Sequence, residues 1–198
     1  MFRHLLSTLL ALGLGSTAFA AEPALRFDIV RKGEVIGSYQ SSLTSREDGG
    51  QELRTVIKAE VGLGPLRLYH FDQSMTEVWR QGRLQALSSQ ADDDGDQHQV
   101  NVRREGEGLV LTVDGKSRLL AADSVPATLW NRQMLEGNRP IFDPVDGEEF
   151  KTQTVCHGSD CQVTGGLQRD LRYGADGLLT GLEFIGDDGT PVSYRPKK

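Results

Sequence analysis

Apolar and polar residues alternate with a period of two along most of the chain from Leu25 onward, and this pattern predicts β-strands. The clearest strand covers residues 52–61. One of its faces is apolar apart from a threonine and consists of Leu53, Thr55, Ile57, Ala59 and Val61. An antiparallel strand with one face buried and the other in water produces this alternation. Other runs of this kind, separated by short turns, cover residues 25–29, 35–44, 66–80, 84–90, 97–104, 109–113, 117–120, 150–155, 161–164, 167–173, 178–185 and 191–195.

Residues 123–147 depart from this rhythm. The segment carries the start and stop signals of a short helix, namely a cap at Asp123 or Ser124, Pro126 in the first turn and Gly137 after the end. Trp130 and Met134 are spaced to lie one turn apart on such a helix. We expect the segment to lie against the concave side or the mouth of the sheet.

These elements predict an all-β protein with one domain over residues 21–198. We expect a single strongly curved antiparallel sheet, or partial barrel, with one short helix-containing insertion. The 23 glycines of the chain suit many strands joined by tight turns.

The first twenty residues have the pattern of a secretory signal peptide. A short basic start is followed by an apolar run and by Ala18-Phe19-Ala20, which predicts cleavage after Ala20. No cysteine follows the cut to accept a lipid anchor, and no second apolar run is long enough to span a membrane. We therefore expect a soluble exported protein, located in the periplasm.

Charge narrows the range of partners. The chain has 28 acidic and 22 basic residues, a net charge of −6, and the two signs are interleaved along the chain. Nucleic acids and anionic lipid headgroups attract a basic surface. The composition therefore argues against a nucleic-acid partner.

The two cysteines, Cys156 and Cys161, lie close together in a chain expected to reach an oxidising compartment. Gly158 between them can adopt a positive φ, so a disulfide closing a small turn is the first interpretation. The alternative is a zinc or copper site that also uses His157. The spacing of the cysteines and the absence of a fourth ligand nearby argue against a metal.

An acidic run, Asp92 to Asp96, raises the possibility of a calcium loop. The EF-hand spacing fails, because Gln97 stands where glycine is required and Arg103 stands where a bidentate glutamate is required. An acidic hairpin tip fits better. The chain also lacks a nucleophile elbow and a phosphate-binding glycine motif, so we predict no catalytic residues, no metal and no cofactor.

The strand over residues 66–80 carries the candidate ligand-binding face. Glu77 shares this face, and a buried carboxyl must be paired or have a raised pKa, which suits ligand binding or proton transfer. A bulge or a salt bridge at the rim is the alternative. The predicted ligand-binding residues are Tyr69, Phe71, Met75, Glu77, Trp79 and, from the insertion, Trp130. Ordinary core packing requires the same apolar residues.

Several short motifs resemble a family of small exported proteobacterial proteins known only as a domain of unknown function. They are Phe27 to Gly37 with its Gly-x-x-Ile-Gly turn, Glu77-Val-Trp79 followed by Gly82-x-Leu84, Pro126-Ala-Thr-Leu-Trp130-Asn131, and Tyr173-Gly-Ala-Asp176-Gly177-Leu178. The family implies a fold and a location but no activity. The strand-rich layout is also distantly similar to lipoprotein-carrier and lipid-binding half-barrels of the periplasm.

Three classes of function follow. The first is a non-enzymatic periplasmic protein that binds a hydrophobic or amphipathic, lipid-like ligand. The second is an accessory protein that contacts an envelope partner through a sheet edge or through residues 123–147. The third is an enzyme that uses Glu77 with a neighbouring base.

Overall fold

The computed structural model describes residues 22–64, 66–130, 132–136, 139–186 and 188–197. The predicted signal peptide, residues 1–20, and its cleavage site lie outside these residues. Within them the all-β prediction is confirmed, because the regular structure consists of strands and one three-residue helical turn.

The strands follow the predicted runs closely and are separated mostly by short turns. In chain order the elements are β1 (Glu22–Arg31), β2 (Glu34–Ser45), β3 (Gln51–Leu63), β4 (Leu66–Arg80), β5 (Arg83–Asp93), β6 (Asp96–Glu105), β7 (Gly108–Val113), β8 (Lys116–Leu120), β9 (Val125–Pro126), η1 (Gln133–Leu135), β10 (Ile141–Phe142), β11 (Glu149–Phe150), β12 (Thr152–His157), β13 (Asp160–Gly165), β14 (Arg169–Tyr173), β15 (Leu179–Ile185) and β16 (Pro191–Pro196).

Thirteen of these strands form one antiparallel sheet in the order β12-β13-β14-β15-β16-β1-β2-β3-β4-β5-β6-β7-β8. Each half of this order is a simple meander, and the two halves join where the last strand, β16, pairs with the first, β1. Strands β8 and β12 are the two edges and do not pair with each other. The predicted curved sheet is therefore confirmed, and it is open rather than a closed barrel.

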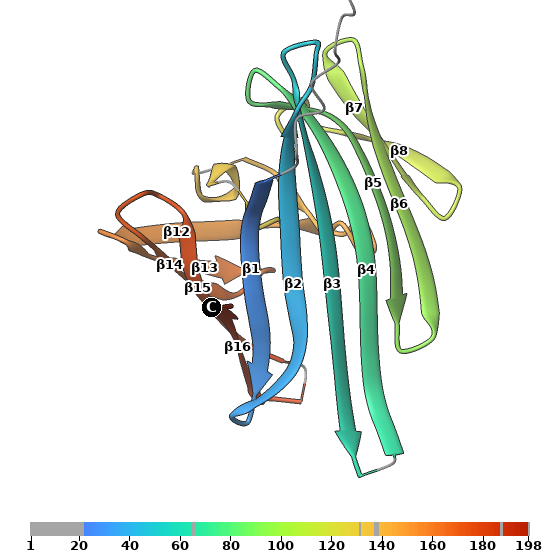
Figure 1. The fold of residues 1–198 in the computed structure, drawn as a ribbon. Coiled ribbons are helices and arrows are strands. Elements are labelled where there is room, and N and C mark those ends of the chain that lie inside the picture. The colour runs from blue at the N-terminus through green and yellow to red at the C-terminus, as the bar shows by residue number, and fades with distance from the viewer. Residues whose placement is uncertain (1–21, 65, 131, 137–138, 187, 198) are drawn as a thin grey trace, which may run out of the picture.

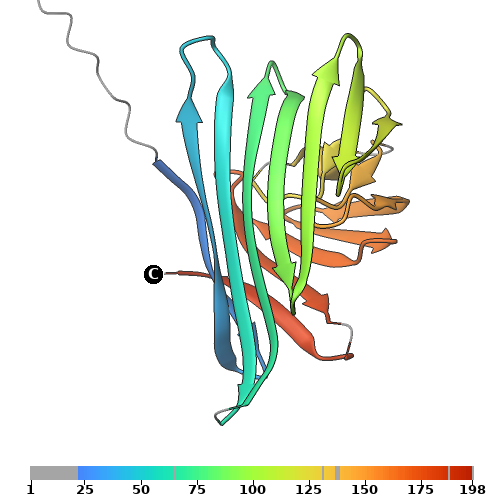
Figure 2. The same ribbon diagram turned by 90° about the vertical axis from the view of Figure 1, so that its right-hand side faces the viewer.

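The sheet folds over on itself into two layers. Strands β1–β8 stand side by side, and β12–β15 cross behind them at a steep angle (Figures 1 and 2). One hydrophobic core takes residues from both layers. Its largest fully buried apolar side chains include Trp79, Phe27, Phe142, Leu53, Leu84, Leu109 and Leu111.

One glycine sets how closely β2 approaches β3. Gly37 lies opposite Ala59, and a Cβ atom at position 37 would stand 2.0 Å from the backbone carbonyl oxygen of Lys58. That separation is far below a van der Waals contact, so a larger residue would force the two strands apart. Gly37, the last residue of the Gly-x-x-Ile-Gly motif, is therefore required for close strand packing.

The short helix predicted within residues 123–147 is reduced to the three-residue 3-10 turn η1, and the predicted start of the helix forms a strand. Strand β9 instead pairs in parallel with β10, and β10 pairs with β11 in a small three-stranded sheet. The amide of Ala127 donates to the carbonyl of Phe142 at 2.9 Å, so a strand partner takes a backbone donor that a helix would have used internally. Val125 and Phe142 become buried in this arrangement. That burial outweighs the capping signals, because a helix shorter than about 12 residues is marginal by itself.

Residues 121–151, here called the crossing segment, connect the edge strands β8 and β12. The segment joins the core through four buried side chains, Val125, Met134, Ile141 and Phe142. Figure 2 shows its yellow and orange trace behind the layer formed by β4–β8. It therefore fills the open side of the sheet, between the two edges.

The predicted disulfide is confirmed. Cys156 on β12 and Cys161 on β13 lie directly opposite each other, with their Cα atoms 4.1 Å apart, and their sulfur atoms are bonded. Gly158 in the turn between them has a φ of 64°, which is the conformation the sequence suggested. The bond excludes the alternative of a metal site at these cysteines.

We expect removal of this disulfide to cost only a modest amount of stability. The C156A/C161A variant should lose about 2 kcal/mol in its free energy of unfolding, because a short loop has little closure entropy to constrain. Urea denaturation of the variant and of the oxidised and reduced native protein measures the loss. A failure of the variant to fold would contradict the expectation and would make the bond a requirement of the whole sheet.

Candidate functional site

A carboxyl group enclosed in the core is the most unusual feature of the inner face. Glu77 on β4 is 0% exposed and lies opposite Leu53 on β3 and Leu87 on β5. Its Oε2 atom accepts two hydrogen bonds from tryptophan side chains. The indole of Trp79 donates at 2.7 Å and that of Trp130 donates at 3.1 Å.

Two different parts of the fold deliver these indoles. Trp79 lies two residues after Glu77 on the same strand, so the alternation of β4 places both side chains inward. Trp130 comes from the crossing segment, and its ring meets that of Trp79 edge to face with the centroids 5.5 Å apart. These are the two tryptophans of the chain, so intrinsic fluorescence reports directly on this site.

Burial dominates the ionisation of Glu77. Loss of hydration raises the pKa of its carboxyl to about 7, although the indole donors of Trp79 and Trp130 and the hydroxyl of Thr128 lower it. Near neutral pH the group therefore changes charge inside the core. The groups that contact this carboxyl are two indoles and a hydroxyl, so any proton transfer at this point would involve the Glu77 carboxyl itself.

Four buried polar atoms of the inner face make no hydrogen bond of standard geometry within the part of the chain that the structure describes. They are the hydroxyl oxygens of Tyr39 and Ser41 on β2, that of Thr55 on β3, and Oε1 of Glu77. We call these four residues the inner polar patch. Tyr39 lies near the hydroxyls of Thr55 and Ser41, and Glu77 lies near that of Thr128, so the patch is incompletely hydrogen-bonded rather than isolated. A buried polar group without a well-formed hydrogen bond costs about 1–3 kcal/mol.

The strand register explains why these groups gather in one place. Ser41 lies opposite Thr55, and Thr55 lies opposite Met75, which is two residues before Glu77 on the same face. Tyr39 lies two residues before Ser41 and is also buried. Burial raises the pKa of its phenol, hydrogen-bonding contacts with Thr55 and Ser41 lower it, and the nearby Glu77 adds to the rise.

A neighbouring buried polar pair on the same face, Gln73 and Ser89, is hydrogen-bonded. Gln73 is buried on β4, and its amide donates at 2.9 Å to the hydroxyl of Ser89 and at 3.4 Å to the carbonyl of Pro144 in the crossing segment. Buried polar groups in proteins are normally paired in this way. In contrast to Gln73, the groups of the inner polar patch contact one another without hydrogen bonds of standard geometry.

Four of the six predicted ligand-binding residues come together here, namely Met75, Glu77, Trp79 and Trp130. Tyr69 and Phe71 share the same face of β4 but lie toward its other end. Tyr69 is 37% exposed there and Phe71 is half-buried. The sequence placed them on the correct face, but it gave no sign of where the second layer stops.

The hydroxyl groups of the patch were missing from the predicted site. One signal was present, because Thr55 is the polar residue on the otherwise apolar face of residues 52–61. Its closeness to Glu77 depends on the register between β3 and β4, which alternation within one strand does not specify.

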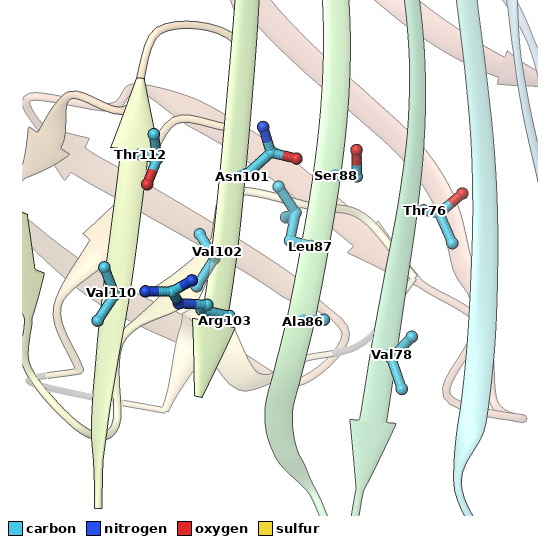
Figure 3. A pocket seen from close by; sticks show the side chains of 10 residues that line it. All are labelled: Thr76, Val78, Ala86, Leu87, Ser88, Asn101, Val102, Arg103, Val110 and Thr112. Carbon is cyan, nitrogen blue, oxygen red and sulfur yellow. The ribbon is translucent and has the colours of Figure 1, made fainter. Parts of the chain in front are cut away.

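A shallow hollow of about 400 Å³ opens on the outer face of β4–β7 (Figure 3). Thr76, Ser88, Asn101 and Thr112 form one row of side chains across it, and Val78, Ala86, Arg103 and Val110 form another. The hollow lies on the opposite side of the sheet from Glu77. It contains none of the groups of the inner polar patch, so we treat it as the weaker candidate.

The acidic run forms the predicted hairpin tip, since Asp93 on β5 pairs with Asp96 on β6 around the turn. Within the described residues, no three His, Cys, Asp or Glu side chains are grouped so that they could hold a metal ion. Nor does that part of the chain contain a helix with the length and apolar character needed to cross a bilayer.

The fold and the site define an all-β protein built on one open, folded-over sheet, with a carboxyl group enclosed between its layers. Residues 27–197 match the family described as a domain of unknown function, DUF6134, and the chain belongs to this family. No curated protein and no solved structure matches the chain. The expected membership of a domain-of-unknown-function family is thus confirmed, and the family assigns no activity.

Proposed function

We propose that the protein is a non-enzymatic binding protein that holds a small amphipathic ligand at the inner polar patch. The observation that carries the proposal is the set of four buried polar atoms on one face that lack hydrogen bonds of standard geometry, beside two indole rings. A ligand that hydrogen-bonds to these atoms would remove their desolvation cost.

The chemistry of the patch defines the ligand class. Ionised Oε1 of Glu77 accepts a hydrogen bond, and the hydroxyls of Tyr39 and Thr55 both donate and accept. The surrounding side chains, among them Leu53 and Met75, are apolar. A molecule with a polar, hydrogen-bond-donating end and an apolar body matches both features.

Access would require the crossing segment to move. Trp130 on this segment is only partly buried, whereas Trp79 on the sheet is 2% exposed. The C-terminal part of the segment is held to β8 by Arg118. This side chain forms an ion pair with Glu149 and donates a hydrogen bond to the carbonyl of Gly147. Displacement around Trp130 would uncover Glu77 without breaking these contacts.

These contacts also bear on the second class of function, an accessory protein that adds a partner strand to a sheet edge. Edge β8 carries Lys116 and Arg118, and Arg118 is held against the crossing segment. Charged and covered edges are typical of sheets that avoid pairing with other chains. Binding inside the folded sheet is therefore the better supported proposal. We further propose that the protein acts in the periplasm after removal of residues 1–20.

The test uses N-phenyl-1-naphthylamine, an apolar probe with one N–H donor. Energy transfer from the tryptophans to the probe should report binding, and the Y39F/T55V variant should weaken it by about tenfold. The same variant should be about as stable as the native protein, because it replaces both members of a contacting pair of buried hydroxyls with apolar groups.

The T76V variant is the matched control, since it removes a hydroxyl from the outer face of β4. It should leave probe binding unchanged. Loss of binding in T76V with no loss in Y39F/T55V would move the ligand to the outer hollow. An absence of any binding to the native protein would contradict the proposed ligand class.

A further inference from the structure

The hairpin of β3 and β4 projects beyond the rest of the sheet. Its two strands pair as far as Leu63 and Leu66, whereas the pairing of β2 with β3 ends at Ala59. On the other side, the pairing of β5 with β4 ends at Phe71. Residues 60–64 and 66–70 therefore extend as a two-stranded ribbon at the lower end of the molecule in Figures 1 and 2.

The end of this ribbon, residues 61–64 and 66–69, has a mainly apolar sequence, and we call it the β3–β4 tip. Leu66 is 59% exposed, Leu68 is 53% exposed and Tyr69 is 37% exposed. Arg67 is the one charged residue in the sequence of the tip. Projecting hairpins normally carry polar residues, as the acidic turn between β5 and β6 does, so an exposed apolar tip indicates a contact surface.

We propose that the β3–β4 tip inserts into the surface of a lipid bilayer composed of neutral, zwitterionic lipids. A stable protein interface needs about 800 Å² from each partner, and a ribbon of two strands presents little area. A bilayer surface requires no complementary shape, because fluid lipids rearrange around an inserted apolar side chain. Leu66 and Leu68 would enter the acyl region, while Tyr69 would lie among the headgroups, where aromatic residues concentrate in membrane proteins.

The charges around the tip select the lipid. Arg67 can extend its guanidinium to a headgroup phosphate while its aliphatic stem stays with the leucines. At the base of the ribbon, His70 lies 3.1 Å from the carboxylate of Asp92 and 3.4 Å from that of Asp94. These acidic groups and the net charge of −6 would repel an anionic membrane.

Flotation with phosphatidylcholine vesicles tests the proposal. The native protein should float with these vesicles, and L66S/L68S should bind at least about tenfold more weakly, since each leucine loses most of its apolar transfer energy. Replacing half of the lipid with phosphatidylglycerol should weaken binding of the native protein. The control is L119S, which removes the 77% exposed leucine of β8 and should float as the native protein does. Equal binding of L66S/L68S and the native protein, or equal loss in L119S, would overturn the proposal.

A second measurement separates insertion from association between copies of the chain. In the L66C variant, an environment-sensitive fluorophore at position 66 should shift to shorter wavelength when phosphatidylcholine vesicles are added. The shift should be independent of protein concentration. A shift that occurs without vesicles as the protein is concentrated would overturn membrane insertion in favour of a second copy of the chain. The absence of any shift with vesicles would overturn it as well.

Discussion

Replacing Trp79 by alanine is expected to destabilise the protein by about 3–5 kcal/mol, the usual cost of deleting a fully buried aromatic side chain. Trp79 is 2% exposed and packs between the layers of the sheet. The substitution also removes the shorter of the two indole hydrogen bonds to Glu77. Chemical denaturation followed by circular dichroism measures the change in the free energy of unfolding.

The W130A variant provides the comparison. Trp130 makes the same kind of hydrogen bond to Glu77 but comes from the crossing segment and is only partly buried. Its loss should cost less, about 1–2 kcal/mol. If the two variants lost equal stability, the crossing segment would be as firmly packed as β4, and the proposed displacement around Trp130 would be wrong.

The second large effect is a dependence of stability on pH that arises from Glu77. Its carboxyl has a pKa of about 7 in the folded protein and 4.5 as the ordinary value, so the folded state holds the proton more tightly. The contribution of Glu77 to the free energy of unfolding should therefore be highest below pH 4.5, fall as the pH rises from 4.5 to 7, and level off above that range. This group alone accounts for a decrease of about 3 kcal/mol.

The contribution of Glu77 is measured as the difference between the native protein and the E77Q variant. Glutamine keeps an oxygen that accepts from the indoles and has no charge to bury. Other carboxyls, such as that of Asp188, have a lowered pKa and act at more acidic pH in both proteins. The difference between the two curves should therefore change only from about pH 4.5 to 7. Parallel curves over that range would show that Glu77 stays in one protonation state.

The alternation of apolar and polar residues was sufficient to predict the strands and the inward direction of Glu77. Each depends on local geometry, because successive side chains of a strand point to opposite faces. The helix signals in residues 123–147 failed for the opposite reason. Val125 and Phe142 gain more from pairing and burial in the core than a short helix could supply, and that gain depends on residues far away in the sequence.

In the candidate site too, contacts within one strand were predictable from the sequence, whereas contacts between strands were not. Glu77 and Trp79 lie on one strand, so their closeness was visible in the sequence. The approach of Tyr39, Ser41 and Thr55 requires the register of three strands, and the approach of Trp130 requires the path of the crossing segment. Such relationships between strands are set by the tertiary fold and leave only a weak mark on the sequence of each strand.

The pairing of β16 with β1 has a consequence for how the chain folds. Every other pairing in the large sheet joins strands that are consecutive along the chain, so those hairpins can form locally and early. Phe27 meets Pro196 only after almost the whole polypeptide has closed into a loop, which carries the largest entropic cost. Until then β1 and β16 are both open edges, on which other chains can pair and aggregate. Strand β16 thus joins the two halves of the sheet. Loss of the C-terminal residues would leave two half-sheets with unpaired edges at β1 and β15.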